Sequence, residues 1–224
     1  MDTKRKRTAQ LAWFMIVFFI LWTLRVTLTY GIDESIASPM LRTVYSNFIR
    51  FFVWVMPAAT FVYILRDASP VKYLGLSVWP NRGNLLLCMI VTGMYLLVVA
   101  ILKLTVSKKY FSVAFLSSIP ITLWLIQLLV PPLIEELLFR GFLVTELRVL
   151  MPLSLTLFMT GILFACIHVP FWAASGANTH AVLISGCNTA VFGALMGWLF
   201  VKTGSIWPST FAHIAANLLP HFFV

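Results

Sequence analysis

Long apolar runs separated by short polar stretches dominate the chain. The runs are uncharged or nearly so, and they cover residues 8–30, 51–65, 83–102, 110–134, 152–168, 181–201 and 205–224. A helix needs about 20 mostly apolar residues to cross a membrane, and these runs are close to that length. The pattern therefore predicts an all-α fold, a polytopic transmembrane helix bundle. We expect polar loops over residues 31–47, 66–84 and 171–180, and a tight turn at Lys202-Thr203-Gly204.

Pro131 and Pro132 interrupt the longest run. Proline lacks a backbone donor and disfavours helical geometry in the residue before it. We therefore expect one helix over about 112–130 and a new one over about 132–150, which makes about eight helices in all. We interpret residues 1–224 as a single integral membrane domain. In it, residues 1–110 form N-terminal helices without a motif, and residues 111–224 carry the polar motifs described below.

Composition and charge support a membrane as the solvent. The chain is 61% hydrophobic and only 10% charged, whereas about a quarter of the residues of a soluble domain are charged. The net charge of +9 is scattered between apolar runs, except for Lys4-Arg5-Lys6-Arg7 before the first run. Such a cluster is typical of a cytoplasmic anchor at anionic lipids. These features exclude nucleic acid as a partner and indicate membrane lipids. Arg50 and Arg66 flank the second run, from where their side chains can snorkel to the interfaces.

Two adjacent acids lie inside apolar sequence. After Asp67 the only acidic residues of the chain are Glu135, Glu136 and Glu146. A carboxylate inside a bilayer is costly unless it is paired or hydrated, so a functional role is its first interpretation. The alternative is an acid pair at a helix start, facing headgroups and favoured by the helix dipole. Glu136 and Arg140 have the i, i+4 spacing of an ion pair. Glu135 points about 100° away and is expected to stay free to act as a base.

Three further polar residues lie in apolar helices. His168 closes the helix that begins near Pro152, and this helix runs antiparallel to the one with Glu135. We therefore expect Glu135 and His168 on the same side of the membrane. His213 and Asn217 share one face of the last helix, where polar groups are costly without partners. The alternatives are a satisfied core histidine at position 168 and interhelical hydrogen bonds from His213 and Asn217.

The three motifs together resemble a known family. Glu135-Glu136-x-x-x-Arg140, Phe164-x-x-x-His168 and His213-x-x-x-Asn217 occur in the order found in the type II CAAX prenyl endopeptidases. This family is also called the Abi or CPBP family of intramembrane proteases, and it includes bacteriocin-processing and bacteriocin-immunity relatives. The resemblance covers about residues 120–220.

The resemblance implies a role for each motif residue. Glu135 and His168 would activate the water that attacks a peptide carbonyl, and His213 and Asn217 would donate hydrogen bonds to the oxyanion. Glu136, Arg140 and Phe164 would support the site. The implied substrate is a membrane-anchored, lipidated or hydrophobic peptide or protein. The compact loops favour a prokaryotic cell membrane and a role in peptide or protein maturation.

Other interpretations compete with a metal-free protease. Glu135, His168 and His213 could form a carboxylate-plus-two-histidine zinc site. Enzymes of the family have been described both as metalloproteases and as glutamate proteases, but the sequence lacks a His-Glu-x-x-His helix, so we favour no cofactor. Polar residues in membrane helices could also form the path of a proton-coupled or ion-coupled transporter, although no inverted repeat is visible. A non-catalytic scaffold of the bacteriocin-immunity type is a third class.

Overall fold

Helices form nearly all of the computed structural model, which describes residues 3–106, 108–113 and 120–223. The α-helices are α1 (Thr3–Ser35), α2 (Pro39–Arg50), α3 (Met56–Arg66), α4 (Pro70–Tyr73), α5 (Arg82–Thr105), α6 (Ile121–Glu136), α7 (Thr145–Leu150), α8 (Leu153–Cys166), α9 (Val169–Ala174), α10 (Thr179–Thr203) and α11 (Ile206–Leu218). Two π-helical segments, η1 (Phe51–Val55) and η3 (Leu137–Val144), join α2 to α3 and α6 to α7, and the 3-10 helix η4 (Leu219–Phe222) follows α11.

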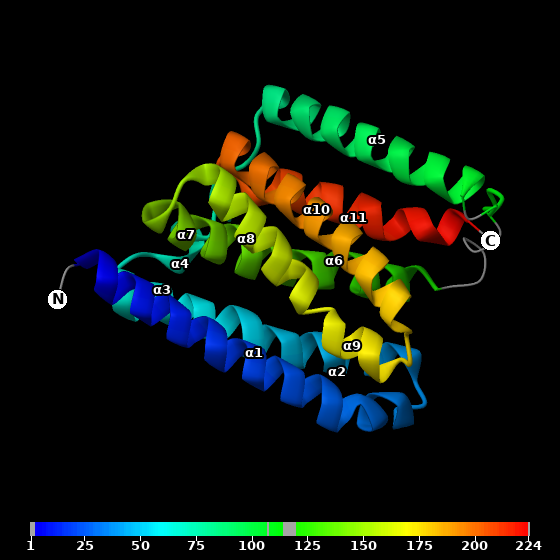
Figure 1. The fold of residues 1–224 in the computed structure, drawn as a ribbon, viewed down its shortest axis with the longest axis horizontal. Helices are drawn as coiled ribbons and strands as arrows, with labels where there is room; N and C mark the ends of the chain where they lie inside the picture. Colours follow the sequence, from blue (N-terminus) through cyan, green and yellow to red (C-terminus); the bar gives the residue numbers. More distant parts are fainter. Residues whose placement is uncertain (1–2, 107, 114–119, 224) are drawn as a thin grey trace.

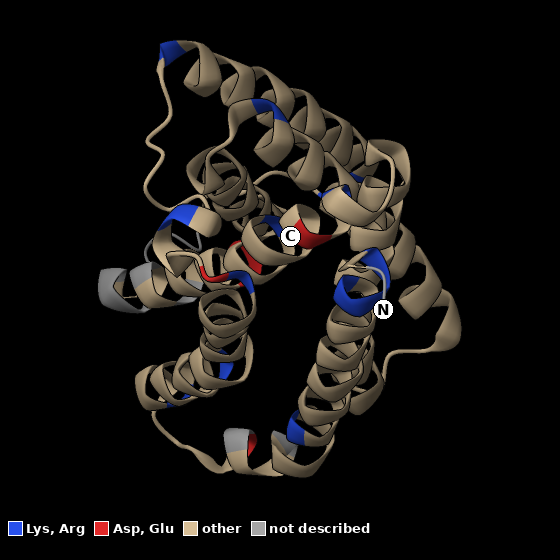
Figure 2. Ribbon diagram, turned by 90° about the vertical axis from the view of Figure 1, so that its left-hand side faces the viewer, with Lys and Arg blue, Asp and Glu red and all other residues tan. Residues whose placement is uncertain are grey.

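Five helical segments are long and apolar enough to cross a membrane. Among the described residues these are Thr3–Thr29, Pro39–Arg66, Arg82–Thr105, Leu153–Ala174 and Thr179–Thr203. The predicted all-α transmembrane bundle is therefore confirmed. Most of the ribbon in Figure 2 is free of charged residues, as expected for helices that face lipid. The predicted turn before α11 is also present, because Gly204 ends α10 in the left-handed conformation with φ of 64°, which glycine adopts without strain.

The prediction of a polar loop over residues 31–47 is wrong. Helix α1 continues to Ser35, and α2 already begins at Pro39. The polar residues instead stabilise the turn between the two helices. Arg42 lies 3.2 Å from the Glu34 carboxylate and donates to the backbone carbonyl of Ile36. The Ser38 hydroxyl accepts from the backbone amide of Leu41, as an N-cap does.

The prediction of a helix break at the proline pair is also wrong. Pro131 and Pro132 lie inside α6, which continues to Glu136 and then, through the π-helical η3, into α7. Helices α2 and α11 both contact α6, and all eight residues of η3 are buried. Neighbouring helices and local π-type adjustments allow a membrane helix to tolerate proline. Tertiary packing therefore overrides the local signal, and the two acids lie immediately before a π-helical segment, a feature that is common at functional sites.

The bundle has two edges and a centre. Figure 1 shows α5 along one edge, α1 with α2 and α3 along the other, and α8, α10 and α11 between them. Helix α8 packs along α10, and α11 contacts α5, α6 and α10. Gly161 of α8 and Gly193 of α10 allow this close approach, because a Cβ added at Gly161 would lie 2.5 Å from the backbone oxygen of Ala190. Small residues bring membrane helices together in this way.

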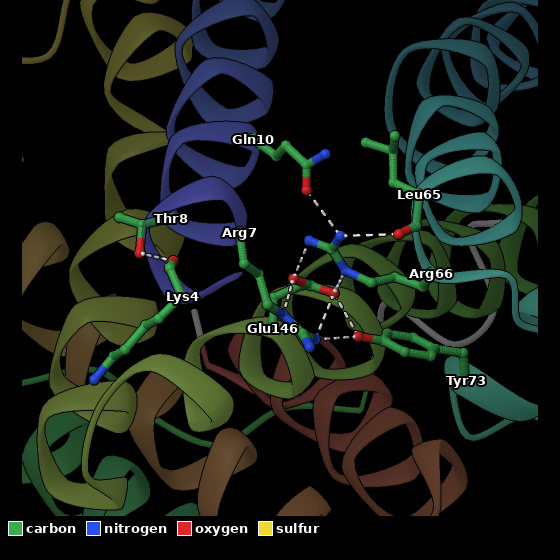
Figure 3. A network of polar contacts seen from close by, with 8 residues as sticks. All are labelled: Lys4, Arg7, Thr8, Gln10, Leu65, Arg66, Tyr73 and Glu146. Atoms are coloured by element: carbon green, nitrogen blue, oxygen red, sulfur yellow. Dashed lines mark hydrogen bonds and ion pairs between the residues drawn. The ribbon is translucent and has the colours of Figure 1, made fainter. Parts of the chain in front are cut away.

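A buried carboxylate ties the N-terminal helices to α7. Glu146 is fully buried and is contacted by Arg7 of α1, Arg66 of α3 and Tyr73 of α4 (Figure 3). Arg7 donates to both carboxylate oxygens at 3.0 Å, and Arg66 donates to both at 2.9 Å. Arg66 ends the second span, but its side chain turns inward to Glu146 and is only 11% exposed. The predicted division into one domain stays a prediction.

Candidate active site

Glu136 is the centre of a buried polar cluster. Its Oε1 lies 3.1 Å from Nη1 of Arg140, and neither side chain is more than 1% exposed. The predicted i, i+4 ion pair is thus present. Arg140 also donates from Nη2 to the backbone oxygen of Gly193 at 3.3 Å. Its guanidinium carbon lies 4.3 Å from the centroid of the Phe164 ring, as in a cation–π contact. This cluster joins the end of α6, η3, α8 and α10.

His213 of α11 is oriented by Glu136. Its Nδ1 lies 2.9 Å from Oε1 of Glu136, and the imidazole is buried between the edges of Phe164 and Phe192. An ionised carboxylate can only accept hydrogen bonds, so Nδ1 carries the proton. The other ring nitrogen, Nε2, then faces Glu135, whose Oε2 lies 3.7 Å away.

Glu135 faces a cavity and has a cationic neighbour. The residue is 7% exposed, and its Oε1 lies 3.5 Å from Nη1 of Arg50 in α2. Glu135, which is expected to act as a base, therefore has a cation at one of its two carboxylate oxygens. Arg50 can snorkel by its place in the sequence, but in the structure its charged end turns toward the carboxylate.

His168 follows the last turn of α8, and its ring orientation is set by the backbone. Its Nδ1 lies 2.9 Å from the carbonyl oxygen of Phe164. A carbonyl can only accept, so Nδ1 donates, and the neutral imidazole presents Nε2 as an acceptor. The ring stacks on Trp172 with an interplanar angle of 27°. Next to it in sequence, the backbone oxygen of Ile167 accepts a 2.8 Å hydrogen bond from the Trp22 indole of α1.

A single cavity of about 410 Å³ brings Glu135 and His168 together. Its wall comes from α1, α2, η1, α6, the junction between α8 and α9, and α9. The lining residues are Trp22, Arg25, Val26, Glu34, Arg42, Thr43, Ser46, Asn47, Arg50, Trp54, Pro131, Glu135, Ile167, His168, Phe171 and Trp172. Such a volume accommodates a small-molecule-sized group or part of a peptide.

The structure does not bring all of the predicted residues to this wall. His213 lies behind Glu135. Asn217 is not one of the described residues that line the cavity, and its side chain is exposed on α11. Conversely, sequence reasoning missed the contribution of the N-terminal helices, above all Arg50. Its only signal was a charged residue at the start of an apolar run.

The residues of the zinc alternative each have another polar partner in the structure. No three His, Cys, Asp or Glu side chains gather in a metal-binding arrangement within the part of the chain that the structure describes. Nδ1 of His213 is hydrogen-bonded to Glu136, and Nδ1 of His168 donates to a backbone carbonyl. The carboxylate of Glu135 lies 3.5 Å from Arg50. Nε2 of each histidine is the ring nitrogen left for a ligand, so zinc stays an alternative.

Comparison with known proteins agrees with the motif pattern. Residues 117–219 match the family model described as type II CAAX prenyl endopeptidase Rce1-like. No curated protein and no solved structure matches the chain. The matched segment contains the three motifs, and it begins after α5. Over residues 117–219, this integral membrane protein is similar to the Rce1-like family of type II CAAX prenyl endopeptidases.

Proposed function

We propose that this protein is an intramembrane endopeptidase that hydrolyses a peptide bond of a membrane-anchored, lipidated or hydrophobic peptide or protein. One observation carries the proposal: Glu135 and His168 line the same cavity, inside a bundle of apolar helices. A base and a hydrogen-bond acceptor at one cavity wall can hold a water molecule between them. The family match supports the same class of reaction. We propose a reaction without a metal, in a prokaryotic cell membrane.

In the first step, Glu135 and His168 activate water. Nε2 of His168 accepts one hydrogen bond from the water and orients it. The Glu135 carboxylate takes a proton from the same water as its oxygen attacks the carbonyl carbon of the peptide bond. General base catalysis of this kind contributes about 10²–10⁴-fold.

In the second step, the tetrahedral intermediate collapses. Glu135 returns its proton to the amide nitrogen, the carbon–nitrogen bond breaks, and the products are an amine and a carboxylic acid. We assign stabilisation of the oxyanion to His213, which can donate from Nε2 when its ring is protonated. Removing one such donor typically costs about 10²–10³-fold in kcat. Asn217 is the second proposed donor, one turn further along α11. Because its side chain is exposed, we assign it the smaller part of the oxyanion stabilisation.

The remaining predicted residues act through His213. Glu136 accepts from Nδ1 of His213 and so selects the tautomer and the ring orientation. Arg140 neutralises Glu136 in the buried cluster, and Phe164 packs against both the Arg140 guanidinium and the His213 ring. We propose that these three residues are supporting, without contact to the substrate.

The test is a cleavage assay in proteoliposomes with a pooled library of membrane-anchored and lipidated peptides. Wild type should cleave at least one peptide, and Glu135→Gln should cleave none. Asp67→Asn is the matched control, because Asp67 is an exposed acid outside the cavity; it should cleave as wild type does. Equal cleavage by wild type and Glu135→Gln would remove Glu135 as the base. A wild type that cleaves nothing would favour the transporter or the non-catalytic scaffold.

A further inference from the structure

Arg50 comes from a helix outside the segment that matches the family, yet its charge lies at the proposed base. It is the last residue of α2, and its Nη1 lies 3.5 Å from Oε1 of Glu135. The Arg50 side chain is 27% exposed and the Glu135 side chain 9%. Both line the cavity. Two opposite charges at this depth interact more strongly than they would in water.

Two indole rings hold the Arg50 guanidinium in place. Its central carbon lies 5.8 Å from the ring centroid of Trp22 and 5.9 Å from that of Trp54. The two rings meet edge to face with centroids 4.7 Å apart, and both residues are buried. Trp22 is itself anchored by its hydrogen bond to the carbonyl of Ile167. A planar guanidinium between such rings loses much of its freedom.

The Glu135 carboxylate has a basic side chain near each of its oxygens. Arg50 lies at Oε1, and Nε2 of His213 lies at Oε2. One partner comes from the N-terminal helices and the other from the last long helix. The ion pair at Oε1 restricts the rotation of the carboxylate, and a base must be held within a few tenths of an ångström to act efficiently.

We infer that Arg50 is a positioning residue of the hydrolytic site, which orients the Glu135 carboxylate toward the cavity. The inference rests on the proposed function. It gives residues 1–110 a specific role, since α1 supplies Trp22, α2 supplies Arg50 and η1 supplies Trp54. Because Arg50 acts through Glu135, its loss should lower kcat and leave KM nearly unchanged.

The activity test uses the peptide that wild type cleaves in proteoliposomes. Arg50→Ala should lower kcat by about 100-fold, the order expected for a misplaced catalytic group, with KM within about twofold of wild type. Arg50→Lys should recover part of this loss, because it returns a cation. Added guanidinium ion should raise the kcat of Arg50→Ala several-fold, since the open cavity admits it, and should not restore Glu135→Gln. Arg148→Ala, at an exposed arginine, is the matched control and should keep the wild-type kcat.

Two results of the activity test would overturn the inference. They are an unchanged kcat in Arg50→Ala, or a folded Arg50→Ala whose loss of kcat neither lysine nor guanidinium restores. A double-mutant cycle tests the pairing of Arg50 with Glu135, even if the wild type cleaves nothing and the proposed function fails. Melting temperatures of wild type, Arg50→Gln, Glu135→Gln and the double variant are compared in detergent. A loss in the double variant smaller than the sum of the single losses supports the pair. Additive losses would contradict it.

Discussion

Replacing Glu146 by glutamine should destabilise the fold strongly. The carboxylate is fully buried and receives two hydrogen bonds from each of two arginines (Figure 3). Glutamine keeps the shape of the side chain but removes the charge, so Arg7 and Arg66 would be left as facing cations. The Arg66 side chain is 11% exposed and that of Arg7 is 23% exposed. Neither can therefore be fully rehydrated without moving.

The magnitude follows from this burial. Removing one partner of a buried ion pair costs about 3–5 kcal/mol. Because Arg7 keeps some contact with solvent, we expect a loss of about 2–4 kcal/mol. For a domain of this size, 1 kcal/mol corresponds to roughly 2–4 °C in Tm. Thermal unfolding in detergent, followed by circular dichroism, should then show a fall in Tm of roughly 5–15 °C.

A second ion pair of the same chain provides the control. Glu34 pairs with Arg42 at 3.2 Å, but its side chain is 57% exposed, and exposed pairs contribute about 0–1 kcal/mol. Glu34→Gln should therefore move Tm by no more than a few degrees. If Glu146→Gln is no less stable than Glu34→Gln, the reasoning from burial is refuted.

The same network predicts a dependence on pH. Burial opposes ionisation of Glu146, which lies outside the five spans, but hydrogen bonds from Arg66, Tyr73 and Arg7 outweigh it and hold its pKa below the usual 4.5. A group whose pKa is lowered by folding stabilises the fold above its unfolded pKa and loses this contribution as the pH falls through its folded pKa. The Tm difference between wild type and Glu146→Gln should thus be constant near neutral pH and shrink below about pH 4.5. A difference that persists unchanged at low pH would contradict the assignment.

Three further predictions concern packing and chemistry. Gly161→Ala should cost about 1–3 kcal/mol through overpacking between α8 and α10, whereas Gly93→Ala, with nothing within 4 Å of the added Cβ, should be neutral or stabilising in thermal unfolding. His213→Ala should lower kcat by about 10²–10³-fold, and Asn217→Ala should lower it less; the reverse order in the proteoliposome assay would move the oxyanion contact to Asn217. Elemental analysis of the purified protein should find well under one zinc per chain, and a stoichiometric zinc that is lost in His168→Ala would overturn the metal-free mechanism.

Much of the fold and part of the site could be predicted from local sequence. The apolar runs predicted the spans, because the length and composition of a membrane helix are local properties. The spacing of Glu136 and Arg140 predicted their ion pair for the same reason, since one turn of helix brings them together. The three motifs predicted the family, and the matched segment agrees. The catalytic roles of Glu135, His168, His213 and Asn217 stay predictions.

Tertiary structure decided the features that depend on distant partners. Pro131 and Pro132 continue a helix because neighbouring helices pack on both sides of it, and no local rule contains that information. Arg50 and Arg66 have the sequence pattern of snorkelling residues, yet each turns inward to a glutamate of the second half of the chain. A charged side chain at the end of an apolar run extends to the membrane interface when water is the only partner within its reach. It turns inward when the fold places an opposite charge within reach in a low-dielectric interior, and only the packed bundle determines which of the two occurs.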